Sequence, residues 1–265
     1  MTRPTDIDDG FLAWIAATHP ILAAVCLAAL VSGFALLFPG LDVAVAALFH
    51  HPGVYADTPF PAEDWPLLQS LRRAGMAVTR WATIVLVLAF SAKIVAPLLA
   101  RAYSTRKLLF LLTSLALGPG LLINAFFKEL WGRPRPVETT IFGGPWPFMP
   151  AWIPGGSCPT NCSFPSGEAS GAAWLLALVF VVPERWRKPT LAAVIVWTLA
   201  ISLNRMAFGS HFLSDVVIGW SLMLVVVLAT RELILIRLPD AAIARLDAVL
   251  ARLGDRLIAP FRPRL

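Results

Sequence analysis

The chain has 265 residues, of which 58% are hydrophobic and 14% are charged, and its mean hydropathy is +0.73. Soluble domains carry about a quarter charged residues, so the composition excludes an ordinary soluble enzyme and indicates an integral membrane protein. The formal net charge of +6 does not indicate a nucleic-acid partner, because the basic residues cluster at the ends of apolar segments, as topology-setting charges do.

Six apolar segments are candidates for crossing a bilayer, which takes about 20 residues of helix. They lie near Pro20–Phe38, Ala77–Leu99, Leu108–Phe127, Ser170–Val182, Pro189–Leu203 and Phe212–Ile236. The fourth and fifth become long enough only if they extend into the polar segments at their outer ends. Residues 1–10 are acidic and precede no small-residue cleavage site, so we expect the first segment to be retained as an anchor. The sequence predicts an all-α membrane bundle of about six transmembrane helices with an outer catalytic loop region.

Basic residues in the short loops predict the orientation of this bundle. The loops after the second and fourth segments hold Arg101, Arg106, Lys107, Arg185, Arg187 and Lys188. The positive-inside rule places these loops in the cytoplasm and the alternate loops outside, although Arg72, Arg73 and Arg80 make the bias imperfect. In the first outer loop, Val45, Leu48 and Phe49 have helical spacing and predict a short interfacial helix.

The chain is expected to form a single domain over residues 1–265, with its core at about 77–236. Residues 237–265 form a tail in which apolar residues recur at helical spacing between arginines. We expect an amphipathic, basic helix on the cytoplasmic leaflet, with a partner-binding helix as the alternative.

Three polar segments interrupt the apolar pattern on the predicted outer side: Lys128–Pro136, Phe164–Glu168 and Asn204–Asp215. In the last of these, His211 and Asp215 are four residues apart and would share one face of a helix. A carboxylate at that spacing can orient an imidazole and stabilise its cation. A helix-capping polar cluster is the alternative interpretation of this stretch taken alone.

The residue types in these segments suit phosphoryl transfer. Lys128, Arg135 and Arg205 supply cations, and the backbone N–H groups of Ser166 and Gly167 precede an apolar segment at which they could face an anion. Attack by a neutral imidazole on phosphorus would give a phosphohistidine that water hydrolyses in a second step.

In order and spacing, the three segments resemble the signature of the type 2 phosphatidic acid phosphatase superfamily: K-x6-R-P, then P-S-G-H, then S-R-x5-H-x3-D. Lys128, Arg135 and Pro136 match the first part, and Arg205, His211 and Asp215 match the third. The resemblance implies His211 as nucleophile, Asp215 as its orienter and no metal or other cofactor.

Two residues depart from the family pattern, Asn204 in place of serine and Glu168 in place of histidine. The family histidine protonates the leaving group. A glutamate with an ordinary pKa near 4.3 is ionised at neutral pH, so it can take that role only if burial raises its pKa. Three roles stay open for Glu168: general acid, base for water, or binding group for a substrate hydroxyl or amine.

Two cysteines lie in the outer loop from Trp131 to Ser163. Cys158 and Cys162 are close enough in sequence to form a disulfide in an oxidising compartment, and zinc binding is the competing interpretation. The aromatic residues of the same loop predict either a lipid-contacting wedge or an ordered loop.

These expectations combine into a membrane lipid phosphatase of a bacterial inner membrane, with its site facing the periplasm and a lipid phosphate as its substrate. Phosphatidic acid, phosphatidylglycerol phosphate, undecaprenyl pyrophosphate and a lipid A phosphate are the candidates. A lipid phosphotransferase and a non-catalytic lipid-phosphate binder or transporter are the alternative functions.

Overall fold

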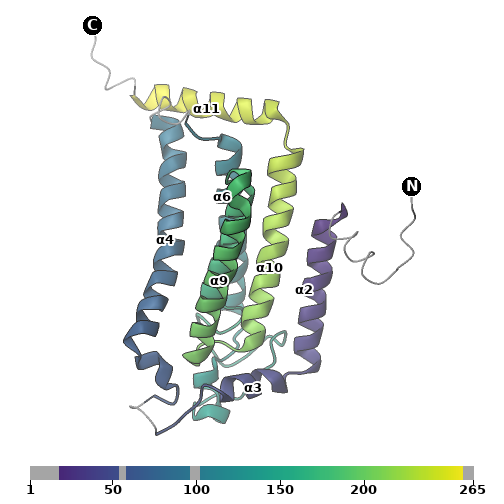
Figure 1. Ribbon diagram of the computed structural model, residues 1–265, viewed down its shortest axis with the longest axis vertical. Coiled ribbons are helices and arrows are strands. Elements are labelled where there is room, and N and C mark those ends of the chain that lie inside the picture. Colours follow the sequence, from purple (N-terminus) through teal and green to yellow (C-terminus); the bar gives the residue numbers. More distant parts are fainter. Residues whose placement is uncertain (1–17, 54–57, 96–101, 259–265) are drawn as a thin grey trace, which may run out of the picture.

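The computed structural model describes residues 18–53, 58–95 and 102–258, and all regular elements in these ranges are helices. Five helices are long and apolar enough to cross a membrane, and they stand side by side (Figure 1). They are α2 (Pro20–Leu37), α4 (Pro66–Val95), Thr105–Leu130 (α6, Thr105–Leu115, with η2, Ala116–Phe127, and α7, Lys128–Leu130), α9 (Glu184–Ala207), and Leu213–Arg237 (α10, Leu213–Thr230, with η6, Arg231–Arg237). The all-α membrane fold is therefore confirmed.

The fourth predicted span is the exception. It corresponds to α8 (Gly167–Trp174, eight residues) and η5 (Leu175–Phe180, six residues), which together are shorter than a bilayer crossing requires. Small residues let α8 pack closely inside the bundle: a Cβ on Gly171 would lie 3.0 Å from Thr79 Oγ1. Six spans are thus not confirmed, and α8 is a buried helix whose first turn carries the second polar segment.

Two helix boundaries differ from the sequence prediction. Helix α9 extends through Asn204 and Arg205 to Ala207, as the length argument required. Helix α4 begins at Pro66 rather than near Ala77, because proline suits the first turn of a helix and the charged residues Arg72 and Arg73 lie on its outer part. The predicted end of this span at 96–99 lies outside the described residues, as do Arg101, residues 1–17 and residues 259–265.

Apolar side chains both fill the bundle and cover its outside. Phe110, Ile123 and Trp174 are almost fully buried in the main core, where the indole N–H of Trp174 donates to Ser114 Oγ at 3.0 Å. Leu30 and Val196, by contrast, are 72% and 67% exposed on membrane-length helices. Outward-facing apolar side chains are expected where hydrocarbon replaces water around a helix.

Two helices lie across opposite ends of the bundle (Figure 1). Helix α11 (Asp240–Ile258) lies at one end, where Arg106 donates to Asp240 Oδ1 at 2.8 Å and Thr105 to Asp247 Oδ1 at 2.6 Å. Helix α3 (Gly40–Ala47), the short helix predicted in the first outer loop, lies at the other end. Short 3-10 turns complete the loops at the α3 end: η1 (Pro61–Asp64), η3 (Pro136–Glu138) and η4 (Thr140–Phe142).

The loop after α7 is ordered by its aromatic residues. Phe127, Trp131, Trp152 and Phe164 form a cluster of edge-on and tilted rings with centroids 5.0–5.7 Å apart, and the indole N–H of Trp131 donates to Ala151 O at 2.7 Å. Such contacts fix the loop at the α3 end of the bundle. The cluster brings the first and second polar segments together.

Candidate active site

His211 lies in the short connection between α9 and α10 and is 2% exposed. Its Nδ1 is 2.8 Å from the carbonyl oxygen of Ser163 and 3.8 Å from Oδ2 of Asp215. A carbonyl can only accept, so Nδ1 carries the proton and Nε2 keeps its lone pair. The backbone of Ser163 therefore fixes the tautomer that a nucleophilic imidazole needs, a partner that the spacing of His211 and Asp215 did not reveal.

Burial keeps this imidazole neutral. Removal from water lowers the pKa of His211 from 6.5 to about 3. The carboxylate of Asp215 acts in the opposite direction and raises this pKa, whereas the positive charges of Lys128 and Arg205 lower it. An imidazole with so low a pKa has its lone pair free at any physiological pH. The ring is thus prepared for attack rather than for proton donation.

Asp215 is fully buried at the first turn of α10 and makes three kinds of contact. Its Oδ2 accepts from the backbone N–H of Phe212 at 2.8 Å and from Ser163 Oγ at 2.5 Å, and its Oδ1 accepts from Arg133. The distance to His211 makes Asp215 an electrostatic partner of the ring and not its direct hydrogen-bond acceptor. A carboxylate so held is ready to stabilise a cation that develops on His211.

Lys128 and Arg135, the cations of the first polar segment, meet at one residue. Lys128 Nζ donates to Asn161 Oδ1 at 2.8 Å, and a terminal nitrogen of Arg135 donates to Asn161 O at 2.8 Å. Asn161 has a positive φ of 49°, which asparagine tolerates better than most residues. It lies between Cys158 and Cys162, which form the predicted disulfide. The cross-linked loop therefore gathers both cations.

Arg205 supplies a third cation from the last turn of α9. It is 2% exposed, yet its Nε and one terminal nitrogen have no hydrogen-bond partner among the described residues. A buried guanidinium with free N–H groups is costly unless a ligand completes its hydrogen bonds. A Cβ on Gly167 would lie 3.5 Å from Lys128 Nζ, and the next residue, Glu168, is paired with Arg205, so these cations gather at the start of α8.

The start of α8 approaches these cations closely. Ser166 caps the helix by accepting from Ala169 N, and its own N–H donates to Asp215 O at 3.0 Å. The expectation that the Ser166 N–H faces an anion is therefore wrong, because this group already has a protein acceptor. A Cβ on Gly167 would lie 2.9 Å from Asn124 Oδ1 and 3.2 Å from Lys128 Cε. Glycine is therefore needed for the helix N-terminus to lie against Lys128, where its partial positive charge favours an anion.

Glu168 lies between two arginines. Its Oε1 is 3.3 Å from Arg205 Nε and 3.6 Å from Arg72 Nε, while its Oε2 is buried without a partner in the described part of the chain. Arg72 belongs to α4 and was not predicted as a site residue. No pattern in the sequence could have found it, since it comes from a helix that none of the three polar segments includes.

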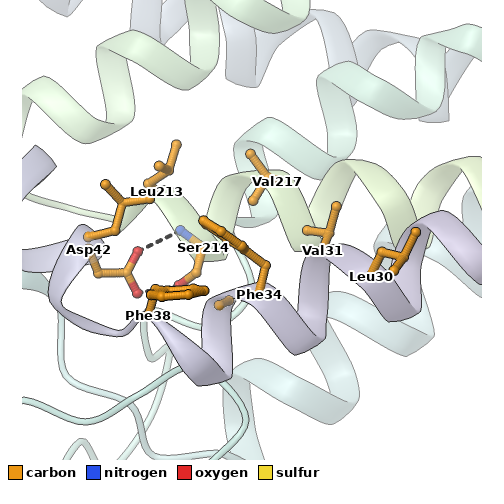
Figure 2. A pocket seen from close by; sticks show the side chains of 10 residues that line it. Leu30, Val31, Phe34, Phe38, Asp42, Leu213, Ser214 and Val217 are labelled. Carbon is orange, nitrogen blue, oxygen red and sulfur yellow. Dashed lines mark hydrogen bonds between the residues drawn. The ribbon is translucent and has the colours of Figure 1, made fainter.

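An apolar groove of about 490 Å³ lies between α2 and the start of α10 (Figure 2). Leu30, Phe34 and Phe38 from α2 line it, opposite Leu213 and Val217 from α10. Its polar residues, Asp42 and Ser214, are hydrogen-bonded to each other. The groove suits hydrocarbon and has no free cation for a phosphate.

Comparison with known proteins identifies the family of the chain. The sequence model of the PAP2 superfamily matches residues 107–237, a range that contains each signature residue. The chain belongs to the PAP2 superfamily. The resemblance noted in the sequence is confirmed.

Three proteins similar to this chain are named lipid A 4′-phosphatases. The chain is 48% identical over 131 residues to one from Rhizobium etli, aligned over 48% of this chain and 50% of the relative. It is 45% identical over 128 residues to one from Rhizobium leguminosarum (48% and 55%) and 40% identical over 113 residues to one from Francisella tularensis subsp. novicida (42% and 51%). The matched segment thus spans about half the length of these relatives. No solved structure is significantly similar to the chain.

Proposed function

We propose that this PAP2 protein hydrolyses the 4′-phosphate of lipid A through a phosphohistidine at His211. The observation that carries the proposal is the buried guanidinium of Arg205, whose Nε has an ion pair with Glu168 at 3.3 Å but no hydrogen bond and whose terminal nitrogen has no partner among the described residues, beside Lys128, Arg135 and a neutral imidazole. A phosphate ester supplies the anion that these groups lack and the electrophile that the imidazole attacks. The lipid A 4′-phosphatases among the relatives support the choice of lipid.

In the first step Nε2 of His211 attacks phosphorus, a P–N bond forms, and the bond from phosphorus to the sugar oxygen breaks. The electron pair of the broken bond goes to the leaving oxygen, which takes a proton from solvent. Lys128, Arg135 and Arg205 stabilise the charge on the phosphoryl oxygens, and Asp215 stabilises the imidazolium, 3.8 Å from its Nδ1. Water then attacks phosphorus, the P–N electrons return to Nε2, and inorganic phosphate leaves.

Among the roles left open for Glu168, its ion pairs support one. Ion pairs with the guanidinium groups of Arg205 and Arg72 require Glu168 to be a carboxylate. The general-acid role requires the protonated carboxylic acid, which would give its proton to the leaving oxygen. A carboxylate accepts hydrogen bonds and cannot donate one. We therefore assign Glu168 to orienting Arg205, with Oε2 available to a polar group of the substrate.

The site is proposed to face the periplasm from a bacterial inner membrane. Basic residues gather at the bundle end that carries α11, including Arg106, Lys107, Arg185, Arg187 and Lys188, which the positive-inside rule assigns to the cytoplasm. The site lies at the opposite end, with α3. An amphipathic α11 with arginines along it would lie on the cytoplasmic leaflet, as the sequence predicted for the tail.

The orientation can be tested with single cysteines in a background that lacks Cys26, Cys158 and Cys162. A cysteine replacing the exposed Pro147 should react with an impermeant maleimide on intact spheroplasts. One replacing the exposed Arg187, at the other end, should react only after lysis. The reverse pattern would overturn the orientation.

The function is tested by phosphate release from purified protein in detergent or nanodiscs. Lipid A 4′-phosphate should be cleaved faster than phosphatidic acid, phosphatidylglycerol phosphate and undecaprenyl pyrophosphate, with His211→Ala inactive on all four. Preference for another lipid would refute the substrate. Loss of the substrate's phosphate to a second lipid, without inorganic phosphate, would establish a phosphotransferase instead.

A further inference from the structure

A buried chain of charges connects the outer helix α3 to the proposed catalytic pair. Arg133 is fully buried and donates to Asp42 Oδ2 at 2.7 Å on one side and to Asp215 Oδ1 on the other. The same arginine donates to Ser214 Oγ at 2.9 Å and to Met149 O at 2.8 Å. Neither Asp42 nor Arg133 belongs to the three-part signature, and Asp42 lies outside the range that the family model matches.

Asp42 also holds the start of α10. Its Oδ1 accepts from the backbone N–H of Ser214 at 2.8 Å, and its Oδ2 accepts from the Ser214 hydroxyl at 2.5 Å (Figure 2). This N–H lies in the first turn of α10. Backbone N–H groups in the first turn of a helix have no acceptor within their own helix. A carboxylate from another helix therefore fills the capping role, and α3 is bound to the turn that carries Asp215.

The charge of this cluster determines what Asp215 can do for His211. Two carboxylates share one guanidinium, so the cluster of Asp42, Arg133 and Asp215 carries one net negative charge. Without Asp42, the guanidinium of Arg133 would pair with Asp215 alone, and the cluster would carry no net charge. The imidazolium that forms when His211 attacks phosphorus would then be stabilised less by its buried counter-charge.

We propose that Asp42 is a positioning residue for His211: it shares Arg133 with Asp215 and so leaves Asp215 with negative charge for the imidazolium. The proposal rests on the proposed function only in taking His211 as the nucleophile. A purely structural role for Asp42 makes a different prediction, because it does not depend on the charge balance of the cluster. The two accounts separate when Asp42 and Arg133 are neutralised together.

The experiment uses two oxyanions on the full chain in nanodiscs. Orthovanadate can form a bond to Nε2 and places positive charge on the imidazole, whereas inorganic phosphate reports on Lys128, Arg135 and Arg205 alone. Dissociation constants are measured by calorimetry for the parent, Asp42→Asn, Asp42→Asn/Arg133→Gln and Ser214→Ala. Asp64→Asn, the same change at an exposed outer-loop carboxylate, is the matched control.

We expect Asp42→Asn to weaken vanadate binding about tenfold and to leave phosphate binding within twofold. The double variant restores one net negative charge, so its vanadate affinity should return to within about threefold of the parent. Ser214→Ala removes hydrogen bonds but no charge and should also stay within threefold, and Asp64→Asn should change nothing. Intrinsic tryptophan fluorescence confirms the fold of each variant.

Three results would overturn the proposal: unchanged vanadate affinity in Asp42→Asn, a parallel loss of phosphate affinity, or a double variant that binds vanadate no better than Asp42→Asn. If Asp42→Asn does not fold, the double variant decides by itself, because balanced removal of the pair should retain vanadate affinity and a large loss contradicts the charge account. Failure of the parent to cleave lipid A would refute the substrate, and the vanadate titrations would still test Asp42.

Discussion

Asp215→Asn separates two roles that an aspartate beside a catalytic histidine can have. Where such an aspartate fixes the tautomer, replacing it with asparagine lowers turnover about 10⁴-fold. Here the Ser163 carbonyl holds Nδ1–H at 2.8 Å, so the tautomer survives the change. What is lost is attraction across the 3.8 Å between Asp215 Oδ2 and Nδ1.

The size of that loss follows from Coulomb's law. At an effective dielectric constant of about 20, a full positive charge 3.8 Å from a carboxylate is stabilised by about 4 kcal/mol. If about half of the charge has developed in the transition state, the contribution is about 2 kcal/mol, or about 30-fold in rate. Asp215→Asn should therefore lower kcat about 30-fold and leave KM within about threefold.

The assay is single-turnover release of phosphate from lipid A 4′-phosphate in nanodiscs, with Asp64→Asn as the control for a changed carboxylate elsewhere. His211→Ala sets the lower limit of detection. A loss of 10⁴-fold or more would refute the reasoning, because it would show that Asp215 and not the Ser163 backbone fixes the tautomer. No loss would show that the imidazolium needs no counter-charge.

Three other expectations follow from the site. Because burial lowers the pKa of His211 to about 3, only about one hundredth of the imidazole is protonated at pH 5, and the rate of phosphoenzyme formation should show no acid limb near pH 6.5 in rapid-quench profiles. Glu168→Gln should lower kcat/KM about tenfold, because the ion pairs with Arg205 and Arg72 are lost, and the basic limb of the pH profile should stay unchanged. A loss above a hundredfold together with disappearance of that limb would show that Glu168 is the general acid. Replacing Cys158 and Cys162 with serine should raise KM three- to tenfold at nearly constant kcat, since their loop holds Asn161 against Lys128 and Arg135, whereas Cys26→Ser should change neither constant.

Much of the site was predictable because its chemistry is local in sequence. His211 and Asp215 are four residues apart, Ser166 and Gly167 precede a helix, and Lys128 and Arg135 flank a short turn, so residue type and spacing together predicted that these residues lie close together, and they predicted the disulfide. His211 itself lies before α10 and not on a helix shared with Asp215. The membrane fold was predictable for a similar reason, since apolar length alone determines which helices can span.

The residues that sequence reasoning missed act across the bundle. Asp42, Arg72 and Asn161 contact the site from an interfacial helix, a separate spanning helix and a cross-linked loop, and no spacing rule relates them to His211. The backbone carbonyl of Ser163 was equally hidden, because any residue type presents one. The fourth predicted span, Ser170–Val182, is not confirmed, because α8 and η5 together are shorter than a bilayer crossing, and a buried helix of small residues is as apolar as a short crossing.

Trapping the phosphohistidine shows whether phosphate passes through His211. Protein mixed with lipid A carrying a ³²P-labelled 4′-phosphate is quenched in alkali within milliseconds, digested and examined by mass spectrometry. We predict an alkali-stable, acid-labile label on the peptide that contains His211, absent in His211→Ala and reduced about 30-fold in its rate of appearance in Asp215→Asn. Phosphate release from lipid A at the parent rate by His211→Ala would contradict the account.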